Sequence, residues 1–213
     1  GSNDTEHAVS TTRKATDLEV LDGILAVSPY YNRPPQEGIR DYYERIGAST
    51  DLPVVLYNIP TRTGKLVEAG TISSLVEGEF VHAVKDATDD TSMTEVLKAR
   101  LGDGVDIYSG NDKLNLDFAY AGAIGAISVA SHWAGEEMGQ MYDAFFEGDK
   151  RRAAEIETFL HESWRFESSH HDYARTFRDV VNPIPTKVII VMLLGKENIG
   201  ECRPPMKASQ DDI

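Results

Sequence analysis

Lys85 ends an apolar run, Phe80-Val-His-Ala-Val-Lys85, and so places an amine at the tip of a predicted strand. Such a lysine is most often a solvated loop residue. An amine that loses its hydration, however, has a lowered pKa, and its neutral form can attack a carbonyl carbon to give a Schiff base. Period-2 alternation places Lys85 on the same side as Val81 and Ala83, so in a barrel it would point into the mouth. The pattern indicates carbonyl condensation or cleavage.

A second apolar run, Pro53-Val-Val-Leu-Tyr57, ends in a tyrosine and leads to an arginine five residues on. The phenol of Tyr57 could carry protons to and from a carbinolamine if it reaches Lys85; the alternative is a tyrosine that caps the core with its hydroxyl in water. Arg62 lies in a predicted turn, Pro60-Thr-Arg-Thr-Gly64, where its guanidinium could grip a substrate carboxylate with two hydrogen bonds. A solvated loop arginine is the competing interpretation.

Other strand ends carry weaker signals. Tyr30 and Tyr31 follow the run at 23–28, and because adjacent side chains face opposite ways, one could serve the site and the other an interface. Ser109-Gly-Asn-Asp112 is a predicted strand-to-helix turn, and its glycine allows close approach of backbone to a ligand. The sequence contains no glycine fingerprint for a dinucleotide or a P-loop.

A metal site is not expected. His161, His170, His171 and Asp172 lie in a predicted helical region away from the strand ends, and neither histidine pair has the i, i+4 spacing that places two ligands on one helix face. The single cysteine, Cys202, excludes an internal disulfide and any multi-cysteine metal site. We therefore expect neither a metal nor another cofactor.

The charge balance limits the partners. Thirty-five acids against twenty-one bases give a net charge of −14, which repels nucleic acid and anionic membranes. The longest apolar stretch, 188–194, is far shorter than the roughly 20 residues of a membrane span, and no basic leader precedes an apolar core. These features favour a soluble cytoplasmic protein. The acidity also suggests salt adaptation, a hypothesis that full stability in dilute buffer would exclude.

The elements that must position these residues alternate along the chain. Strand-like runs are predicted at 23–28, 53–57, 80–85, 106–109 and 125–129, with helices before them at 4–18, 36–48, 67–76, 93–101 and 114–121. After residue 129 only helices are predicted, at 136–147, 151–164, 171–180 and 183–194. Continuous apolar strands that alternate with helices predict a parallel α/β sheet or barrel. Because five strands do not close a barrel and the chain opens with a helix, we expect that both ends are cut.

Six motifs, in order, resemble one enzyme family over nearly the whole chain. They are Pro-Tyr-Tyr-Asn at 29–32, Leu-Tyr-Asn-Ile-Pro-Thr-Arg-Thr-Gly at 56–64, Val-Lys-Asp-Ala-Thr at 84–88, Ser-Gly-Asn-Asp at 109–112, Ile-Ser-Val at 127–129 and Asn-Pro-Ile-Pro at 182–185. This set resembles the pyruvate-dependent class I aldolases of the dihydrodipicolinate synthase and N-acetylneuraminate lyase family.

The resemblance implies a TIM (β/α)8 barrel with a C-terminal helical extension, and usually a homotetramer built as a dimer of dimers. Residues 1–135 would form a partial barrel, strands 4 to 8 of the family, and residues 136–213 the last barrel helix and the helical extension. The first three strands and the last helix would then be absent. The missing part includes the threonine that links the two tyrosines of the family's proton relay.

The resemblance also implies a reaction, in which Lys85 forms a Schiff base with pyruvate. The resulting enamine would attack L-aspartate-4-semialdehyde, giving 4-hydroxy-tetrahydrodipicolinate in lysine and diaminopimelate biosynthesis. Tyr57 would be the proton shuttle, Tyr31 would reach into a neighbouring subunit's site, and Arg62 would hold the site mouth and the aldehyde's carboxylate. The pyruvate would meet the backbone of Gly110 and Ile127, and feedback inhibition by lysine would use Asn3, Glu6 and Tyr30.

Some features keep alternatives open. Asp86 follows the lysine where the synthases more often have Glu, and Arg203-Pro-Pro resembles the 2-keto-3-deoxygluconate aldolases of the family, whereas Arg62 favours the synthase. The absent strands favour an inactive paralogue or fragment that serves as a binding or assembly subunit. The joint retention of Lys85, Tyr57, Tyr31 and Arg62 opposes that interpretation. A metal-dependent aldolase is a weaker third alternative.

Overall fold

The computed structural model describes residues 1–164, 183–195 and 202. The chain divides into two compact units, 1–127 and 128–213, each of which is described by itself. Several sequence predictions lie outside the described residues: the helix at 171–180, the metal candidates His170, His171 and Asp172, and the Arg203-Pro-Pro motif.

The first unit is built on a five-stranded parallel sheet. Its strands pair in sequence order, each with the next along the chain. Parallel neighbours need crossover connections, and each crossover here contains a helix. This confirms the predicted parallel α/β architecture. The strands are β1 (Ile24–Val27), β2 (Val54–Asn58), β3 (Ala83–Asp86), β4 (Asp106–Ser109) and β5 (Gly125–Ala126).

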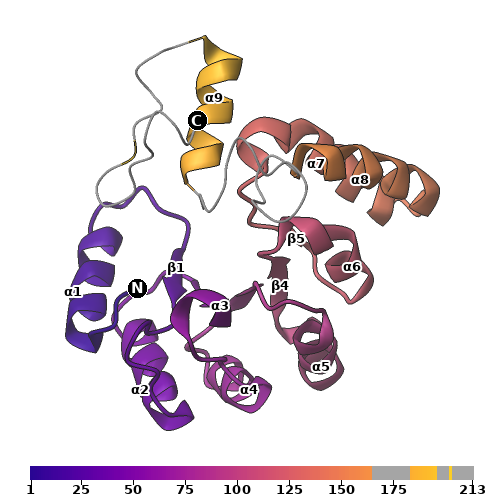
Figure 1. Cartoon of the computed structure of the whole chain (residues 1–213). Coiled ribbons are helices and arrows are strands. Elements are labelled where there is room, and N and C mark those ends of the chain that lie inside the picture. The colour runs from indigo at the N-terminus through magenta and orange to yellow at the C-terminus, as the bar shows by residue number, and fades with distance from the viewer. Residues whose placement is uncertain (165–182, 196–201, 203–213) are drawn as a thin grey trace. The chain divides into compact units, whose positions relative to one another are not determined.

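The helices of this unit form an arc along the outer side of the strands (Figure 1). Within the arc, the first helix contacts the second, the second contacts α4, and α4 contacts α5. The five helices of the arc are α1 (Thr5–Thr16), α2 (Gln36–Gly47), α4 (Ala69–Glu77), α5 (Ser92–Leu101) and α6 (Asn115–Tyr120). Shorter turns are α3 (Pro60–Thr63), η1 (Gly102–Gly104) and η2 (Asp112–Leu114).

The core lies between the sheet and these helices. One register row across the sheet, Ala26, Leu56, Val84 and Ile107, is 0–1% exposed. Burial of a large apolar side chain contributes about 1.5–3 kcal/mol, so this row and the helix side chains that cover it hold the layers together. The hydroxyl of Tyr43, on α2, donates to the carbonyl of Ala26 at 2.9 Å, which satisfies its buried polar atom.

The second unit is helical in its described part. It contains α7 (Ser131–Phe146), α8 (Lys150–Trp164) and α9 (Ile184–Leu194), and α7 packs along α8 after a turn at Gly148. His161 is exposed on α8, in agreement with its predicted place on a helix surface. None of the described helices is both long enough and apolar enough to cross a membrane.

The boundaries of a strand, a turn and a helix differ from those that the sequence predicts. The predicted strand at 80–85 begins only at Ala83, because the N–H groups of Phe80 and Val81 both donate to the carbonyl of Leu75 and so close the end of α4. The predicted turn around Arg62 is a single helical turn, α3, which ends at Gly64 with φ of 76°. α7 begins before the predicted residue 136 and is kinked at Ala134.

Candidate active site

Lys85 and Tyr57 meet at the carboxyl end of the sheet. They are register partners on β3 and β2, and both therefore project from the same face. The Nζ atom of Lys85 lies 4.2 Å from the centre of the Tyr57 ring, and the lysine is only 8% exposed. The amine thus exchanges most of its hydration for contact with an aromatic face. The proximity that the sequence left open is present.

The surroundings of these two groups change their acidity. Burial lowers the pKa of Lys85 below its ordinary 10.5, although the carboxylate of Asp112 acts in the opposite sense. Burial raises the pKa of Tyr57, while the positive charge of Arg62 works against that rise. Tyr57 therefore remains a proton-bearing phenol at neutral pH, beside an amine that loses its proton more readily than a solvated lysine.

Gly110 leaves the space that the Lys85 side chain occupies. A Cβ atom placed on Gly110 would lie 2.8 Å from Cε of Lys85 and 2.8 Å from Cβ of Ala87, both closer than carbon atoms approach one another. Gly110 follows β4 directly, and its N–H donates to the carbonyl of Asp86 at 2.7 Å. The glycine is therefore required by close approach and not by an unusual backbone angle.

We expect that Gly110→Ala displaces the lysine side chain. A misplacement of about 1 Å can cost on the order of 10²-fold in rate, so the rate of reaction of Lys85 with a carbonyl compound is expected to fall by about 10- to 100-fold. Gly104→Ala is the matched control, because its added methyl meets nothing within 4 Å. Reductive trapping rates measured on both variants test the steric argument; equal rates would contradict it.

Arg62 is carried on a loop that Asn58 holds in place. The buried side chain of Asn58 donates to the carbonyl of Val67 at 3.0 Å and accepts from the N–H of Val67 at 3.1 Å. These two bonds close the loop that contains α3. Arg62 itself is exposed, and its charge acts on Tyr57. The structure therefore places an exposed cationic side chain where its charge acts on Tyr57 of the Lys85 and Tyr57 pair.

The N–H groups of Gly110 and Ile127 are already used in the sheet. That of Gly110 donates to Asp86, and that of Ile127 donates to the carbonyl of Ser109 at 2.9 Å. A ligand at this face can therefore reach these two residues only through their carbonyl oxygens, which accept hydrogen bonds. A hydroxyl or protonated group suits such a position.

The side chains of Tyr30 and Tyr31 are both exposed. Tyr31 is 87% exposed and adopts a left-handed backbone with φ of 71°, whereas Tyr30 is 42% exposed. A side chain as exposed as Tyr31 has almost no packing within its own chain. The structure thus does not bring Tyr31 together with Lys85 and Tyr57.

Asn3 and Glu6 lie at the start of the chain, near the segment after β1. The side-chain amide of Asn3 donates to the side-chain oxygen of Asn32 at 3.3 Å, and the amide of Asn32 donates to the carbonyl of Asn3 at 2.8 Å. Glu6 accepts from Arg45 of α2 in an exposed ion pair. Asn3 is therefore joined to the Tyr30 segment through Asn32.

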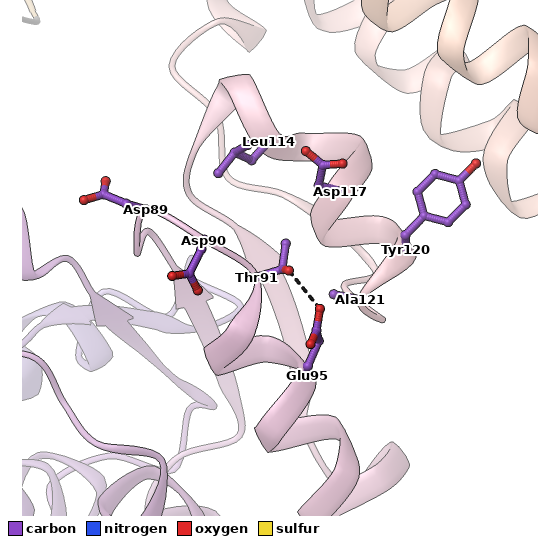
Figure 2. Close-up of a pocket in the computed structure, with 8 residues that line it drawn as sticks. All are labelled: Asp89, Asp90, Thr91, Glu95, Leu114, Asp117, Tyr120 and Ala121. Carbon is purple, nitrogen blue, oxygen red and sulfur yellow. Dashed lines mark hydrogen bonds between the residues drawn. The ribbon is translucent and has the colours of Figure 1, made fainter.

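A separate cavity of about 630 Å³ lies between the loop before α5 and helix α6. Figure 2 shows four carboxylates on its lining, and Thr91 donating to Glu95 at 2.9 Å. So much negative charge repels an anionic substrate, and the lining has no amine. We therefore exclude it as a site for carboxylate chemistry. The lining residues are Asp89, Asp90, Thr91, Glu95, Leu114, Asp117, Tyr120 and Ala121.

Two acids at this end of the sheet, to which the sequence assigned no catalytic role, lie close to the candidate site. Asp112, 9% exposed, acts electrostatically on both Lys85 and Tyr57. Asp86, 0% exposed, follows the lysine directly. The sequence indicated Asp86 only through its position after the lysine, not through its burial. No group of three or more histidine, cysteine or acidic residues in the described part of the chain could hold a metal ion.

Comparison with known proteins gives a consistent result. A model of the dihydrodipicolinate synthetase family matches residues 1–213. The 4-hydroxy-tetrahydrodipicolinate synthase of Acaryochloris marina is 37% identical over 214 residues, which cover 100% of this chain and 68% of that protein. The enzyme of that name from Moorella thermoacetica is 38% identical over 197 residues, 91% of this chain and 62% of the relative.

Solved structures agree with these relatives. The dihydrodipicolinate synthase of Aquifex aeolicus superposes with a TM-score of 0.87 at 34% identity, covering 100% of this chain and 69% of that one. A dihydrodipicolinate synthase from Cyanidioschyzon merolae, solved with lysine bound, gives a TM-score of 0.87 at 34% identity, with 98% and 67% covered. The chain spans about two thirds of the length of its relatives.

Proposed function

This chain belongs to the dihydrodipicolinate synthetase family, and from that membership we propose that it is a pyruvate-dependent lyase of the class I aldolase type. Its substrates are pyruvate and L-aspartate-4-semialdehyde, and its product is 4-hydroxy-tetrahydrodipicolinate, on the route to lysine and diaminopimelate. The observation that carries the proposal is the buried amine of Lys85, whose Nζ lies 4.2 Å from the ring centre of Tyr57.

The chemistry begins at Lys85. Its neutral amine attacks the keto carbon of pyruvate, and loss of water from the carbinolamine leaves an imine. Removal of a proton from the methyl group gives an enamine, whose carbon attacks the aldehyde and forms the new carbon–carbon bond. Water or an internal amine then releases the lysine. The lowered pKa of Lys85 raises the fraction of amine that can start this sequence.

Tyr57 transfers the protons that these steps require. A phenol next to the amine can protonate the departing hydroxyl of the carbinolamine and recover the proton later. Arg62, in the loop that follows β2, binds the carboxylate of the aldehyde substrate with its guanidinium. The carbonyl oxygens of Gly110 and Ile127 can accept a hydrogen bond from the hydroxyl of the carbinolamine.

The five strands correspond to strands 4 to 8 of a (β/α)8 barrel. In this proposal residues 1–135 are the partial barrel and residues 136–213 the last barrel helix with the C-terminal helical extension. The support is the parallel order of the strands, the helical second unit, and the 69% of a solved relative that the chain covers. Sheet edges at β1 and β5 would pair with the remaining strands of the barrel.

The exposed Tyr31 suits a site shared between subunits. In a homotetramer built as a dimer of dimers, Tyr31 completes the proton relay of the neighbouring subunit, which explains why it does not pack on its own lysine. We also place the enzyme in the cytoplasm, on the basis of its family and of a net charge that does not favour membranes or nucleic acid.

Feedback inhibition by lysine is proposed at Asn3, Glu6 and Tyr30. The carboxylate of Glu6 can bind an ammonium group, although it now pairs with Arg45, and a relative has been solved with lysine bound. We expect L-lysine to inhibit the enzyme and Glu6→Gln to raise the inhibitory concentration about tenfold, as loss of one charged partner would. Titration of activity with L-lysine measures this; an unchanged inhibition constant would assign the site elsewhere.

The test of the function is a product assay on the longest natural form of the protein. Pyruvate and L-aspartate-4-semialdehyde should give 4-hydroxy-tetrahydrodipicolinate at a rate at least about 100 times that with pyruvate and D-glyceraldehyde, because Arg62 binds a carboxylate that glyceraldehyde lacks. Arg62→Ala should reduce that preference. Equal use of both aldehydes by the unchanged enzyme would reject the assignment of the substrate while leaving the Schiff-base chemistry intact.

A further inference from the structure

A row of buried polar side chains lies one residue beyond the row that contains Lys85. Asn58, Asp86 and Ser109 are register partners across three strands, and each is 0% exposed. Because side chains alternate along a strand, this row faces away from the side on which Tyr57 and Lys85 meet. Buried polar groups need hydrogen-bond partners, so their partners reveal what the row holds.

Each of the three side chains binds the segment that follows its own strand. Asn58 binds the backbone of Val67 with two hydrogen bonds. Ser109 exchanges hydrogen bonds with the backbone of Asn111, at 3.1 and 3.2 Å. The row therefore fixes the loops at the carboxyl end of the sheet, where the candidate active site lies.

Asp86 makes the most extensive set of these bonds. Its Oδ1 accepts from the N–H of Thr88 at 3.1 Å and from the hydroxyl of Thr88 at 2.7 Å. Its Oδ2 accepts from the hydroxyl of Thr94, in the first turn of α5, at 2.8 Å. One carboxylate thus joins the end of β3 to the loop after it and to the next helix.

The backbone of Asp86 fixes the other side of the lysine. Its carbonyl accepts from the N–H of Gly110 at 2.7 Å, and Gly110 lies so close to the Lys85 side chain that an added Cβ would displace a neighbour. Lys85 therefore passes between Gly110 and the ring of Tyr57. The direction of its amine depends on the position of the last residue of β3.

We infer that Asp86 is a positioning residue for the amine of Lys85, and that its carboxylate acts through Thr88 and Thr94 to hold the end of β3. It does so by hydrogen bonding, because its carboxylate oxygens accept from Thr88 and Thr94 on the face of the strand opposite to the Lys85 side chain. The inference rests on the proposed function, because positioning matters only if Lys85 is the nucleophile.

The test compares three variants of the longest natural form of the protein. Asp86→Ala removes all three side-chain hydrogen bonds. Asp86→Asn keeps an oxygen that accepts from Thr88, and its NH2 group can donate to the hydroxyl of Thr94. Asp90→Ala is the matched control, because Asp90 lies in the same loop and accepts from the N–H of Ser92 at 2.8 Å but is exposed. Far-ultraviolet circular dichroism shows whether each variant is folded.

Two readouts are measured against pH. The first is the rate at which pyruvate is trapped on Lys85 by borohydride. The second is competitive acetylation of Lys85 without pyruvate, mapped by mass spectrometry, which gives the pKa of the amine even if pyruvate does not react. Failure of the unchanged protein to trap pyruvate would reject the proposed function. The role of Asp86 would still be tested, because the acetylation of Lys85 in the variants does not depend on pyruvate.

For Asp86→Ala we expect the trapping rate at neutral pH to fall at least about tenfold, because displacement of a nucleophile by a fraction of 1 Å has effects of this size. The pKa of Lys85 should rise towards 10.5 as the amine regains water. Asp86→Asn should restore most of the trapping rate and most of the lowered pKa of Lys85. Asp90→Ala should match the unchanged protein in both quantities.

Other outcomes would overturn the inference. If folded Asp86→Ala keeps the trapping rate and the pKa of Lys85, the carboxylate only stabilises the loop. If Asp86→Asn loses as much as Asp86→Ala, the charge and not the hydrogen bonding is what matters. Should Asp86→Ala fail to fold, Thr94→Val replaces it, since this change removes the single bond to Oδ2; an unchanged acetylation profile in that variant would equally reject the role of Asp86.

Discussion

Replacement of Lys85 by methionine is expected to abolish the reaction of the protein with pyruvate. The methionine side chain has similar length and fills the space beside Tyr57 and Gly110 but has no amine, so no imine can form. Loss of a covalent nucleophile commonly costs on the order of 10⁴-fold or more in turnover. Product formation and borohydride trapping measured on the same preparation check this expectation.

Lys85→Arg is the matched variant for charge. It keeps a cation near Tyr57 but cannot form a Schiff base with a ketone at neutral pH, because the guanidinium stays protonated. Both variants should therefore be inactive. Persistent trapping of pyruvate on another lysine in Lys85→Met would show that the nucleophile lies elsewhere.

Lys85→Met also has an expected effect on stability. Burial lowers the pKa of Lys85 in the folded state, so the folded protein binds fewer protons than the unfolded chain. Its stability therefore rises with pH through the window between that lowered pKa and 10.5, and the full cost of burying the charge is present below that window. We expect Lys85→Met to unfold at a higher temperature than the unchanged protein at pH 7, by a difference that shrinks above pH 10. Thermal unfolding at several pH values measures it.

Tyr57→Phe is the second large expected effect. The change keeps the aromatic ring beneath Nζ of Lys85 and removes only the hydroxyl, which isolates proton transfer from packing. General acid–base groups typically contribute about 10²- to 10⁴-fold, so turnover should fall within that range. The adduct with pyruvate should still form, more slowly.

Tyr43→Phe is the control for loss of a tyrosine hydroxyl. Tyr43 is 0% exposed and donates to the carbonyl of Ala26, so its loss should reduce stability by about 0.5–1.5 kcal/mol without a matching loss of turnover. If Tyr57→Phe and Tyr43→Phe reduce turnover equally, the effect of Tyr57 is structural. A pH–rate profile then shows whether an ionisation assigned to Tyr57 has vanished.

Much of the fold followed from the pattern of apolar runs. The strand at 106–109 and the helix that begins at residue 36 agree with the structure, because in both cases composition, period and turn residues favour the same boundaries. The start of β3 was less predictable. Phe80 and Val81 are as apolar as the strand itself. They are excluded from it because their N–H groups donate to the carbonyl of Leu75, and no sequence motif indicates these two hydrogen bonds.

The site was predictable in its residue types but not in its support. Both residues end predicted strands, which the sequence displays, but the register that places Tyr57 beside Lys85 is known only from the structure. The sequence did not predict that Asp86 is buried and bound by Thr88 and Thr94. This burial depends on how α5 packs against the end of β3, and a sequence that reads Val-Lys-Asp-Ala-Thr fits an exposed turn equally well. The role that we propose for Tyr31 requires a second subunit, so neither the sequence nor the structure of one chain tests it.

The central claim is that Lys85 forms a Schiff base with pyruvate, and borohydride trapping followed by peptide mapping tests it most directly. The measurement should be made on the longest natural form of the protein, with and without pyruvate. A reduced pyruvyl adduct on the peptide that contains Lys85, and its absence from Lys85→Met, is the result that our account predicts. A folded protein that gives no adduct, or one on a different lysine, would contradict it.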